Sequence, residues 1–159
     1  MRKLKLYLDT SVWSFVFAAD APEKRDATKE FFELVRKGEY EVYISEVVIK
    51  EISNAPESKR ALLGELLKNC PVVELEITEV AVELSKHYID KGILSADKED
   101  DALHVAIATV AEMDALVTWN FRHLANLRKA ELFHGASLEM GYFKKLEMIT
   151  PMEVGDYEN

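Results

Sequence analysis

The sequence has a single cysteine, Cys70, and no long hydrophobic run. One cysteine forms no disulfide within the chain and cannot supply a cysteine-cluster zinc site. No apolar run approaches the roughly 20 residues that cross a bilayer, and Met1-Arg2-Lys3 leads into a short strand pattern, unlike the long apolar core of a signal peptide. These absences predict a protein of the cytoplasm without a membrane segment.

Positive charge is also scarce, because 20 Lys and Arg stand against 29 Asp and Glu, a formal net charge of −9. Binding of nucleic acid through a broad basic surface requires many cations that neutralise phosphates, so any nucleic-acid contact must be local. Carboxylates that converge raise one another's pKa unless a cation lies between them. The acidity therefore favours a metal site.

The length and the 48% of hydrophobic residues predict one globular domain with a substantial core. No internal repeat or low-complexity tract divides the chain. We expect the domain to span residues 1–151 and an acidic C-terminal tail to span residues 152–159.

Short apolar stretches alternate with amphipathic stretches along the chain. Strands are expected at 4–8, 42–44, 72–75, 115–118 and 146–149. Helices are expected at 22–37, 46–54, 57–69, 79–91, 102–113 and 121–129, with 12–17 a short buried helix or groove wall and 138–145 irregular or helical. Strands that alternate with helices predict an α/β fold, a five-stranded parallel sheet with helices on both faces.

Polar residues end two of these strands. Asp9 follows the first strand, and Asn120 follows the fourth. Ligands of open parallel sheets bind beyond the carboxyl ends of the strands, where the winding reverses, so neighbouring first and fourth strands would bring Asp9 and Asn120 together there. The alternatives are that Asp9 or Thr10 only caps a helix near Val12, and that Asn120 is a turn residue.

Two further acids can face the same edge. Glu51 lies in the helix after the second strand, and Asp101 lies in the first turn of the helix before the fourth. Carboxylates with an amide oxygen give an oxygen-only ligand set, which suits Mg²⁺ or Mn²⁺ rather than zinc. The alternatives are a solvated acid at Glu51 and favourable contact with the helix dipole at Asp100 and Asp101.

Four motifs in this order resemble the PIN-domain family from Leu4 to about Pro151. They are Leu6-Tyr7-Leu8-Asp9-Thr10-Ser11, Ile49-Lys50-Glu51-Ile52, Asp101-Ala102-Leu103-His104-Val105-Ala106-Ile107-Ala108 and Leu116-Val117-Thr118-Trp119-Asn120. The resemblance implies a three-layer α/β/α sandwich. It also implies an Mg²⁺- or Mn²⁺-dependent ribonuclease, like the toxins of VapC-type toxin–antitoxin pairs, with the acidic roles at Asp9, Glu51 and Asp101.

The sequence departs from the family pattern at Asn120, where members usually have Asp. An amide oxygen can ligate a hard cation but brings no negative charge, so we expect weaker metal affinity. Asp100 offers partial compensation, although adjacent helical residues point about 100° apart.

The resemblance leads to a mechanism in which metal ions held by the three acids polarise the phosphate of RNA and activate a water. His104 shares a helical face with Asp101; a core or hydrogen-bonding role is favoured for it, with contact to RNA as the alternative. Weaker candidates for RNA contact are the hydroxyls of Thr10 and Ser11, the guanidinium of Arg122, and the rings of Trp13 or Trp119.

Two other functions remain open. Asn120 makes a catalytically weak or silent PIN-like module, acting by RNA or protein binding, the main rival. A phosphatase with Asp9 as nucleophile is less favoured, because Ser11 stands where such sites place a second Asp. Apolar surface on 13–17 and on the helices between 23 and 67 predicts a homodimer that takes up an antitoxin.

Overall fold

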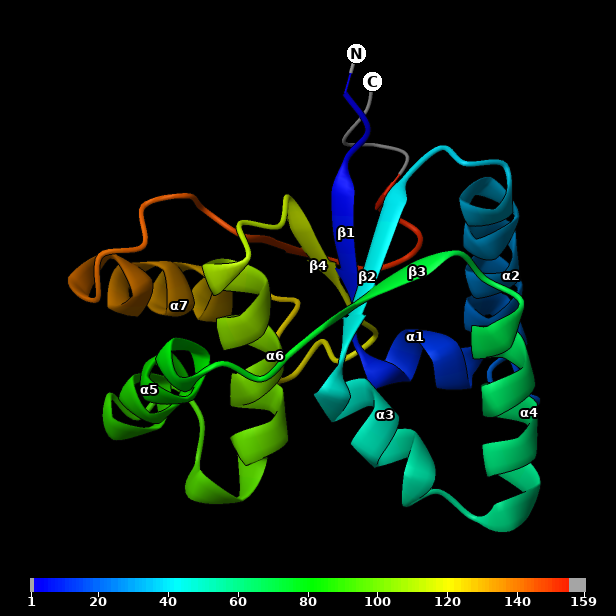
Figure 1. Cartoon of the computed structure of the whole chain (residues 1–159), viewed down its shortest axis with the longest axis horizontal. Helices are drawn as coiled ribbons and strands as arrows, with labels where there is room; N and C mark the ends of the chain where they lie inside the picture. Colours follow the sequence, from blue (N-terminus) through cyan, green and yellow to red (C-terminus); the bar gives the residue numbers. More distant parts are fainter. Residues whose placement is uncertain (1, 155–159) are drawn as a thin grey trace.

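A computed structural model describes residues 2–154, which form a five-stranded sheet between two layers of helices (Figure 1). The sheet order is β3-β2-β1-β4-β5, and every pair is parallel. The strands are β1 (Lys5–Leu8), β2 (Glu41–Ser45), β3 (Val72–Leu75), β4 (Ala115–Val117) and β5 (Glu147–Ile149). The predicted α/β class, the parallel sheet and its five strands are confirmed.

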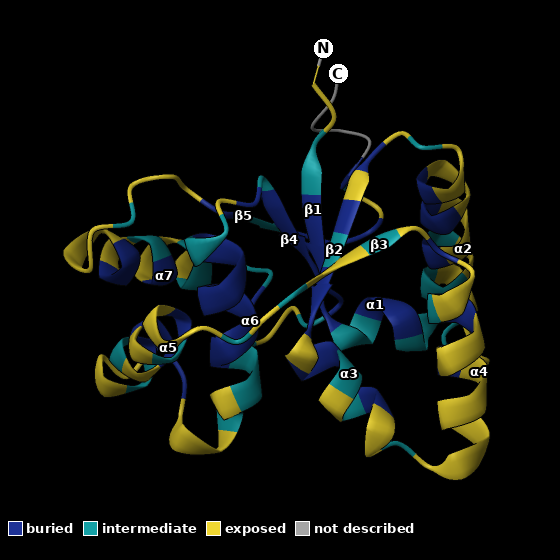
Figure 2. Ribbon diagram, in the orientation of Figure 1, coloured by how far each residue is buried: buried dark blue, intermediate teal, exposed yellow. Residues whose placement is uncertain are grey.

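Within residues 2–154, seven α-helices cover the two faces of the sheet. The bounds are α1 (Thr10–Phe15), α2 (Pro22–Arg36), α3 (Glu46–Ser53), α4 (Glu57–Lys68), α5 (Glu79–Asp90), α6 (Glu99–Val110) and α7 (Leu127–Glu139). The first four helices pack mainly in one buried cluster and the last three in another, one on each face of the sheet, and α3 also contributes Val47 to the second. Figure 2 shows buried residues toward the sheet and exposed residues on the outer helix faces.

Strand β1 divides these two clusters by the alternation of its side chains. Leu6 and Leu8 pack in the cluster of α1 to α4, whereas Tyr7 packs in the cluster of α5 to α7. A tyrosine between two leucines therefore places a hydroxyl group inside the second layer.

The winding of the sheet reverses at β1, which pairs with β2 on one side and β4 on the other. Leu8 is in register with Val117, so the residues that follow these two strands emerge side by side. The predicted neighbourhood of the first and fourth strands is confirmed. Figure 1 shows β1 leading into α1 and β2 into α3 at the edge from which α6 begins.

The predicted helix at 121–129 is wrong over most of its length. Residues 121–126 form turns, because the side chains of Asn120 and Asn126 accept hydrogen bonds from the backbone N–H groups of His123 and Lys129. The second of these bonds is the cap of α7, which continues to Glu139. The 138–145 stretch is helical only over its first two residues.

Two smaller differences concern helix and domain ends. Helix α6 begins at Glu99 rather than at Ala102, so its first turn contains three acids. Val154 is buried in the core, three residues beyond the expected end of the domain. The rest of the expected tail, 155–159, lies outside the described residues.

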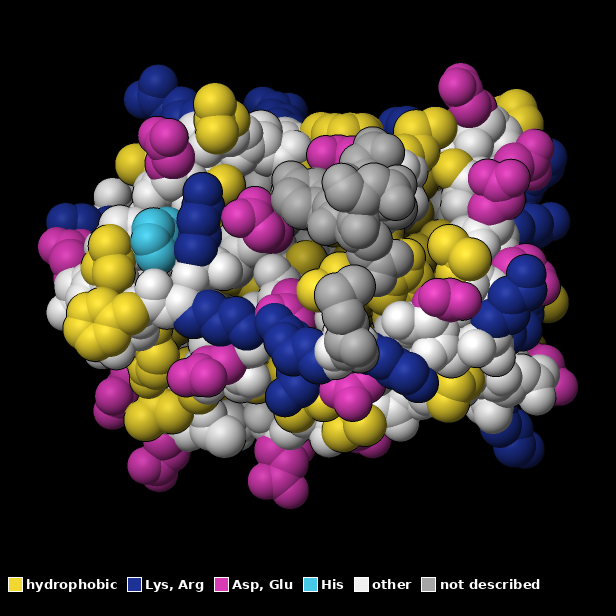
Figure 3. Space-filling view, turned by 90° about the horizontal axis from the view of Figure 1, so that it is seen from above, with side chains coloured by type: hydrophobic (Ala, Val, Ile, Leu, Met, Phe, Trp, Pro, Cys, Tyr) yellow, Lys and Arg dark blue, Asp and Glu magenta, His cyan; other side chains and the backbone are white. Residues whose placement is uncertain are grey.

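The face seen in Figure 3 carries charged side chains of both signs. Lys and Arg side chains are interspersed there with Asp and Glu (Figure 3).

Within residues 2–154, none of the helices combines the length and apolar character needed to span a bilayer.

Candidate active site

Asp9 is the most buried acid of the sheet edge, with 4% of its surface exposed. Its Oδ1 accepts hydrogen bonds from the backbone N–H and the hydroxyl of Ser11, at 3.0 and 2.5 Å. Its Oδ2 accepts a hydrogen bond from the hydroxyl of Thr118 at 2.5 Å. Asp9 is thus the N-cap of α1, as the structural alternative expected, and also stands at the switch point of the sheet.

Asn120 and Asp101 lie beside Asp9. The amide nitrogen of Asn120 lies 3.4 Å from Oδ2 of Asp101, and the backbone N–H of Asn120 donates to the same Thr118 hydroxyl that bonds Asp9. The Oδ1 of Asn120 accepts a hydrogen bond from the N–H of His123 at 3.0 Å. Asn120 therefore combines the turn role with a position at the acidic edge, and it presents an N–H rather than an oxygen to Asp101.

Glu51 reaches the edge from α3, with 30% of its side chain exposed. Its Oε1 accepts a hydrogen bond from the hydroxyl of Thr10 at 2.7 Å and lies 2.6 Å from Nε2 of His104. Thr10 begins α1 and His104 lies in α6, so one carboxylate oxygen joins three helices.

His104 is 1% exposed and belongs to a buried hydrogen-bonded chain. Its Nδ1 lies 2.7 Å from the hydroxyl of Tyr7, which lies 2.6 Å from the hydroxyl of Ser45. Ser45 caps α3 by accepting a hydrogen bond from the N–H of Val47 at 3.1 Å. This series of hydrogen bonds therefore fixes both the start of α3 and the side chain of Glu51.

Sequence reasoning missed the roles of three residues in this network: Tyr7, Ser45 and Thr118. Ser45 directly precedes the helix expected at 46–54 and caps it, but its bond to Tyr7 was not foreseen. The sequence signal that could have identified them is that each is a hydroxyl residue within or directly after an apolar strand.

The pKa values divide the acids into two kinds. Burial raises the pKa of Asp9, with a further increase from the charge of Glu51. Burial likewise raises the pKa of Asp101, reinforced by the charges of Asp9 and Glu51. Negative charge at these two positions is therefore incompletely compensated by the protein, and a bound cation would relieve it.

Glu51 behaves in the opposite way because it has a cationic partner. Burial opposes its ionised form, but the hydrogen bond and charge of His104 and the hydroxyl of Thr10 hold its pKa below the usual range. Burial disfavours the imidazolium of His104, yet Glu51, Asp9 and Asp101 together raise its pKa. Each member of this buried His104–Glu51 pair therefore favours the charged form of the other.

The donor chemistry of the edge fits a hard divalent cation, since it offers carboxylate, hydroxyl and amide groups and no sulfur. The carboxylates do not already surround one point: in the described part of the chain, no three His, Cys, Asp or Glu side chains form a group able to hold a metal ion. Glu51 is the reason, because its Oε1 is turned to Thr10 and His104.

Several residues proposed from the sequence take other positions. Asp100 forms an ion pair with Lys50 at 2.7 Å, so one of its carboxylate oxygens is already paired with a cation. The burial of His104 favours the hydrogen-bonding role over contact with RNA. Trp13 and Trp119 are both buried, so the expectation that one of them stacks on a base is wrong. Arg122 is exposed, three residues after the buried ring of Trp119.

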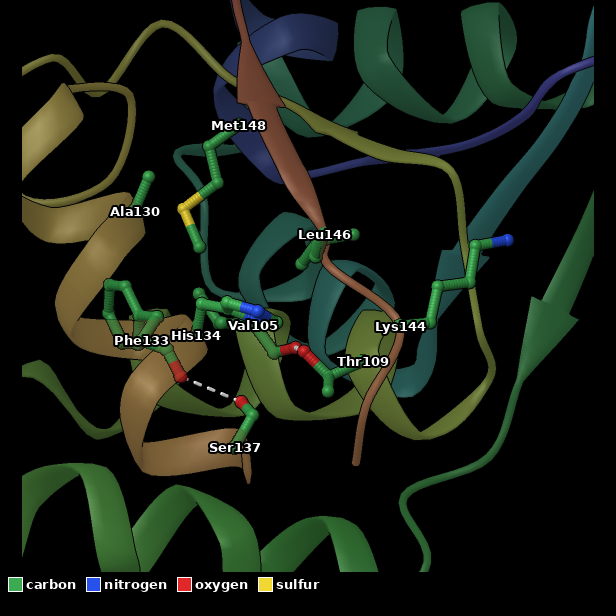
Figure 4. A pocket seen from close by; sticks show the side chains of 9 residues that line it. All are labelled: Val105, Thr109, Ala130, Phe133, His134, Ser137, Lys144, Leu146 and Met148. Atoms are coloured by element: carbon green, nitrogen blue, oxygen red, sulfur yellow. Dashed lines mark hydrogen bonds between the residues drawn. The ribbon is translucent and has the colours of Figure 1, made fainter. Parts of the chain in front are cut away.

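A pocket away from this edge lies between α6, α7 and the segment that leads into β5 (Figure 4). Its hydroxyl groups are used within their own helices: Ser137 donates to the carbonyl of Phe133 and Thr109 to that of Val105, each at 2.8 Å. With Leu146, Met148 and Ala130 in its wall, the pocket is a packing defect of the second layer rather than a reactive site.

Comparisons with known proteins agree with this architecture. The sequence matches a family model described as PIN domain over residues 5–122. No curated protein matches the chain. Two solved structures share the fold at low identity: VapBC2 from Rickettsia felis, bound to a DNA fragment from its promoter (TM-score 0.57, 15% identity, 92% of this chain and 98% of that chain), and VapC20 from Mycobacterium tuberculosis, a toxin that cleaves the sarcin-ricin loop (TM-score 0.52, 14% identity, 74% and 92%).

Proposed function

Because the chain belongs to the PIN-domain family, we propose that it is a divalent-metal-dependent endoribonuclease of the toxin kind. The observation that carries the proposal is the meeting of Asp9, Asp101 and Asn120 at the switch point, with Glu51 beside them. Uncompensated acids at the carboxyl edge of a parallel sheet suit a metal-assisted reaction on a phosphate.

The proposed metal is Mg²⁺ or Mn²⁺, held by Asp9 and Asp101, with Glu51 and Asn120 as further ligands. When bound, such an ion polarises a phosphodiester and lowers the pKa of a water molecule. Glu51, whose carboxylate is held by Thr10 and His104, would orient that water. Arg122, exposed next to the site, supplies positive charge for a phosphate oxygen.

We propose RNA as the substrate, an antitoxin as the partner, and the cytoplasm as the place of action. The family resemblance supports all three, and the fold shared with VapC20, a loop-cleaving toxin, supports the first. The net charge of −9 supports a local contact with RNA near the carboxylates rather than a wide basic groove.

The test is cleavage of a labelled single-stranded RNA by the purified protein with Mn²⁺, with Mg²⁺ and with chelator. We expect cleavage only with metal, and a loss of at least about a hundredfold in Asp9→Asn and Asp101→Asn, since several kcal/mol of charge stabilisation depend on the ion. Asn retains an oxygen for the N–H of Ser11, so the cap of α1 and the fold are preserved. Cleavage by Asp9→Asn at the parental rate would show that the site is misplaced.

The matched control is Asp90→Asn, which removes one acid from an exposed position near the end of α5. It changes the net charge by the same amount as Asp9→Asn and leaves the acidic edge intact. We expect parental activity from this variant, which separates loss of the site from loss of charge.

A second function is favoured by one observation at Asn120. Its amide nitrogen faces Asp101, and its amide oxygen accepts a hydrogen bond from the N–H of His123. In this arrangement Asn120 adds no oxygen ligand to those of the neighbouring carboxylates. This arrangement suits a PIN-like module that binds RNA or protein without cutting. Tight RNA binding with no cleavage in either metal would favour the module over the enzyme.

A further inference from the structure

Three aromatic rings and one lysine form a cluster next to the acidic edge. The rings of Phe15 and Trp119 lie 5.6 Å apart, and those of Trp119 and Phe121 lie 6.1 Å apart. The ammonium of Lys24 lies over all three rings, at 5.9 Å from Phe15, 5.7 Å from Trp119 and 5.1 Å from Phe121. We call these four residues the aromatic–lysine cluster.

The cluster has a fixed base and an open surface. Trp119 is buried, and its indole N–H donates to the hydroxyl of Thr28 at 2.8 Å, which holds the ring in place. Phe121 is 45% exposed, while Phe15 and Lys24 are half-buried. A phenylalanine this exposed gains little from burial, so its position beside a cation suggests a surface for a ligand.

The charge of Lys24 is not used elsewhere in the described part of the protein. Its ammonium forms no ion pair or hydrogen bond there, and aromatic rings are its partners. It is a half-exposed cation in a chain of net charge −9, so it attracts an anion at this one place.

The cluster is continuous with the acidic edge. Trp119 stands between Thr118, which bonds Asp9, and Asn120, which contacts Asp101. Its backbone N–H donates to the hydroxyl of Ser11 at 3.0 Å, and Phe15 lies one helical turn after Ser11. The backbone that carries Trp119 is therefore shared by the cluster and the acidic edge.

We propose that the aromatic–lysine cluster binds an unpaired base of single-stranded RNA next to the bond that is cleaved. The ring of Phe121 stacks on the base, and Lys24 pairs with the neighbouring phosphate. Every base has a face for stacking, so the contact tolerates many sequences. It requires a base that is free of a duplex, because paired bases stay stacked inside the helix. This inference rests on the proposed function for its ligand.

The test is binding of a fluorescent single-stranded RNA in chelator, where no cleavage occurs, with a duplex of the same sequence for comparison. We expect the parent to prefer the single strand. Phe121→Ala should weaken that binding by about tenfold and remove the preference. Phe121→Leu, which keeps apolar packing against Trp119 but has no ring, should show the same loss, and its folding is checked by circular dichroism.

The matched control is Phe143→Ala. Phe143 is 77% exposed and precedes β5, so it lies toward the opposite edge of the sheet. Its removal should leave RNA binding unchanged. Lys24→Gln should weaken binding and lower its dependence on salt, because one phosphate contact is lost.

An abasic nucleotide locates the contact. At the correct position of the RNA it should cost the parent about as much affinity as Phe121→Ala, and it should cost Phe121→Ala nothing further. Parental binding by Phe121→Ala, or equal binding of duplex and single strand by the parent, would overturn the inference.

The two proposals fail separately. Metal-dependent cleavage with unchanged RNA affinity and KM in Phe121→Ala would refute the cluster and leave the enzyme intact. Phe121-dependent binding without cleavage in any metal would refute the enzyme and retain the cluster as an RNA contact.

Discussion

Asp9 is at once a helix cap and the most buried acid of the site, so the two interpretations of it from the sequence are compatible. The cap explains how a carboxylate with a raised pKa is held at the tip of β1: three donors from Ser11 and Thr118 fix both of its oxygens. Burial of this charge lowers stability in the absence of a cation.

Asn120→Asp is the sharpest test of the neighbouring position. An Asp at this position adds charge next to Asp101, where acids already raise one another's pKa. In chelator we expect an unchanged or lower melting temperature. With Mn²⁺ or Mg²⁺ we expect a larger rise than in the parent, because a ligand that binds only the folded state stabilises it. Thermal unfolding across a metal titration measures both effects.

The contrary result is also informative at Asn120. A variant whose melting temperature ignores metal over the whole titration would place this side chain outside the site. It would then serve only the turn at 120–123, through its bond to the N–H of His123.

At the level of elements, helix α3 carries Glu51, and Ser45 is the N-cap of this helix. Ser45→Ala removes the cap bond to Val47 and one partner of the buried Tyr7 hydroxyl, which keeps its contact with His104. We expect a loss of about 1 kcal/mol in the free energy of unfolding and a several-fold loss of RNA cleavage. Urea unfolding and cleavage rates measure the two effects.

Thr78→Ala is the control for this element. Thr78 caps α5 through the N–H of Ala81, and this helix carries none of the acids proposed to bind the metal. Its removal should cost similar stability and leave cleavage unchanged. Equal cleavage rates in the Ser45 and Thr78 variants would show that the cap of α3 does not determine the position of Glu51.

The opposite edge of the sheet is closed by Asp114, which precedes β4. Hydrogen bonds from Arg2, at 2.7 and 2.8 Å, and further contacts with Lys5 and Lys144 hold the pKa of Asp114 well below its usual range. A lowered folded-state pKa adds stability above the unfolded value of 3.8, and this contribution is lost as the pH falls toward the folded value.

Asp114→Asn should therefore lower the free energy of unfolding at neutral pH by about 1 kcal/mol, a modest amount because its cationic partners are solvent-exposed. The difference from the parent should shrink below about pH 4. Urea unfolding at several pH values measures it. A difference that stays constant down to about pH 2, or grows with acid, would contradict the ion-pair explanation.

The elements show what sequence could and could not predict. Apolar runs ended by polar residues locate all five strands and the switch point, and the pattern is strongest in β1 and β4, which are buried on both faces. The pattern does not reveal the partner of Tyr7, since His104 lies 97 residues away and either face of β1 is apolar. Helix α7 was misplaced because the decisive bonds come from the side chains of two asparagines, not from periodicity.

At the scale of the whole molecule, the expected homodimer remains a prediction. Its original basis is partly lost, because Trp13, the first residue of the 13–17 run, is buried in the core. Apolar surface is still exposed at Phe17 in the loop after α1, at Leu34 in α2 and at Leu62 in α4. We expect light scattering to give about twice the mass of one chain. A monomeric mass at high protein concentration would contradict this prediction.

The central claim is that the acids at the switch point form one site for a divalent cation. Calorimetric titration with Mn²⁺, without RNA, tests it most directly. We predict saturable binding by the parent and by Asp90→Asn, and at least about a tenfold loss of affinity in Asp9→Asn and Asp101→Asn, since each removes a charged oxygen ligand. Equal affinity of the parent and Asp9→Asn, or no saturable binding by the parent, would contradict the claim.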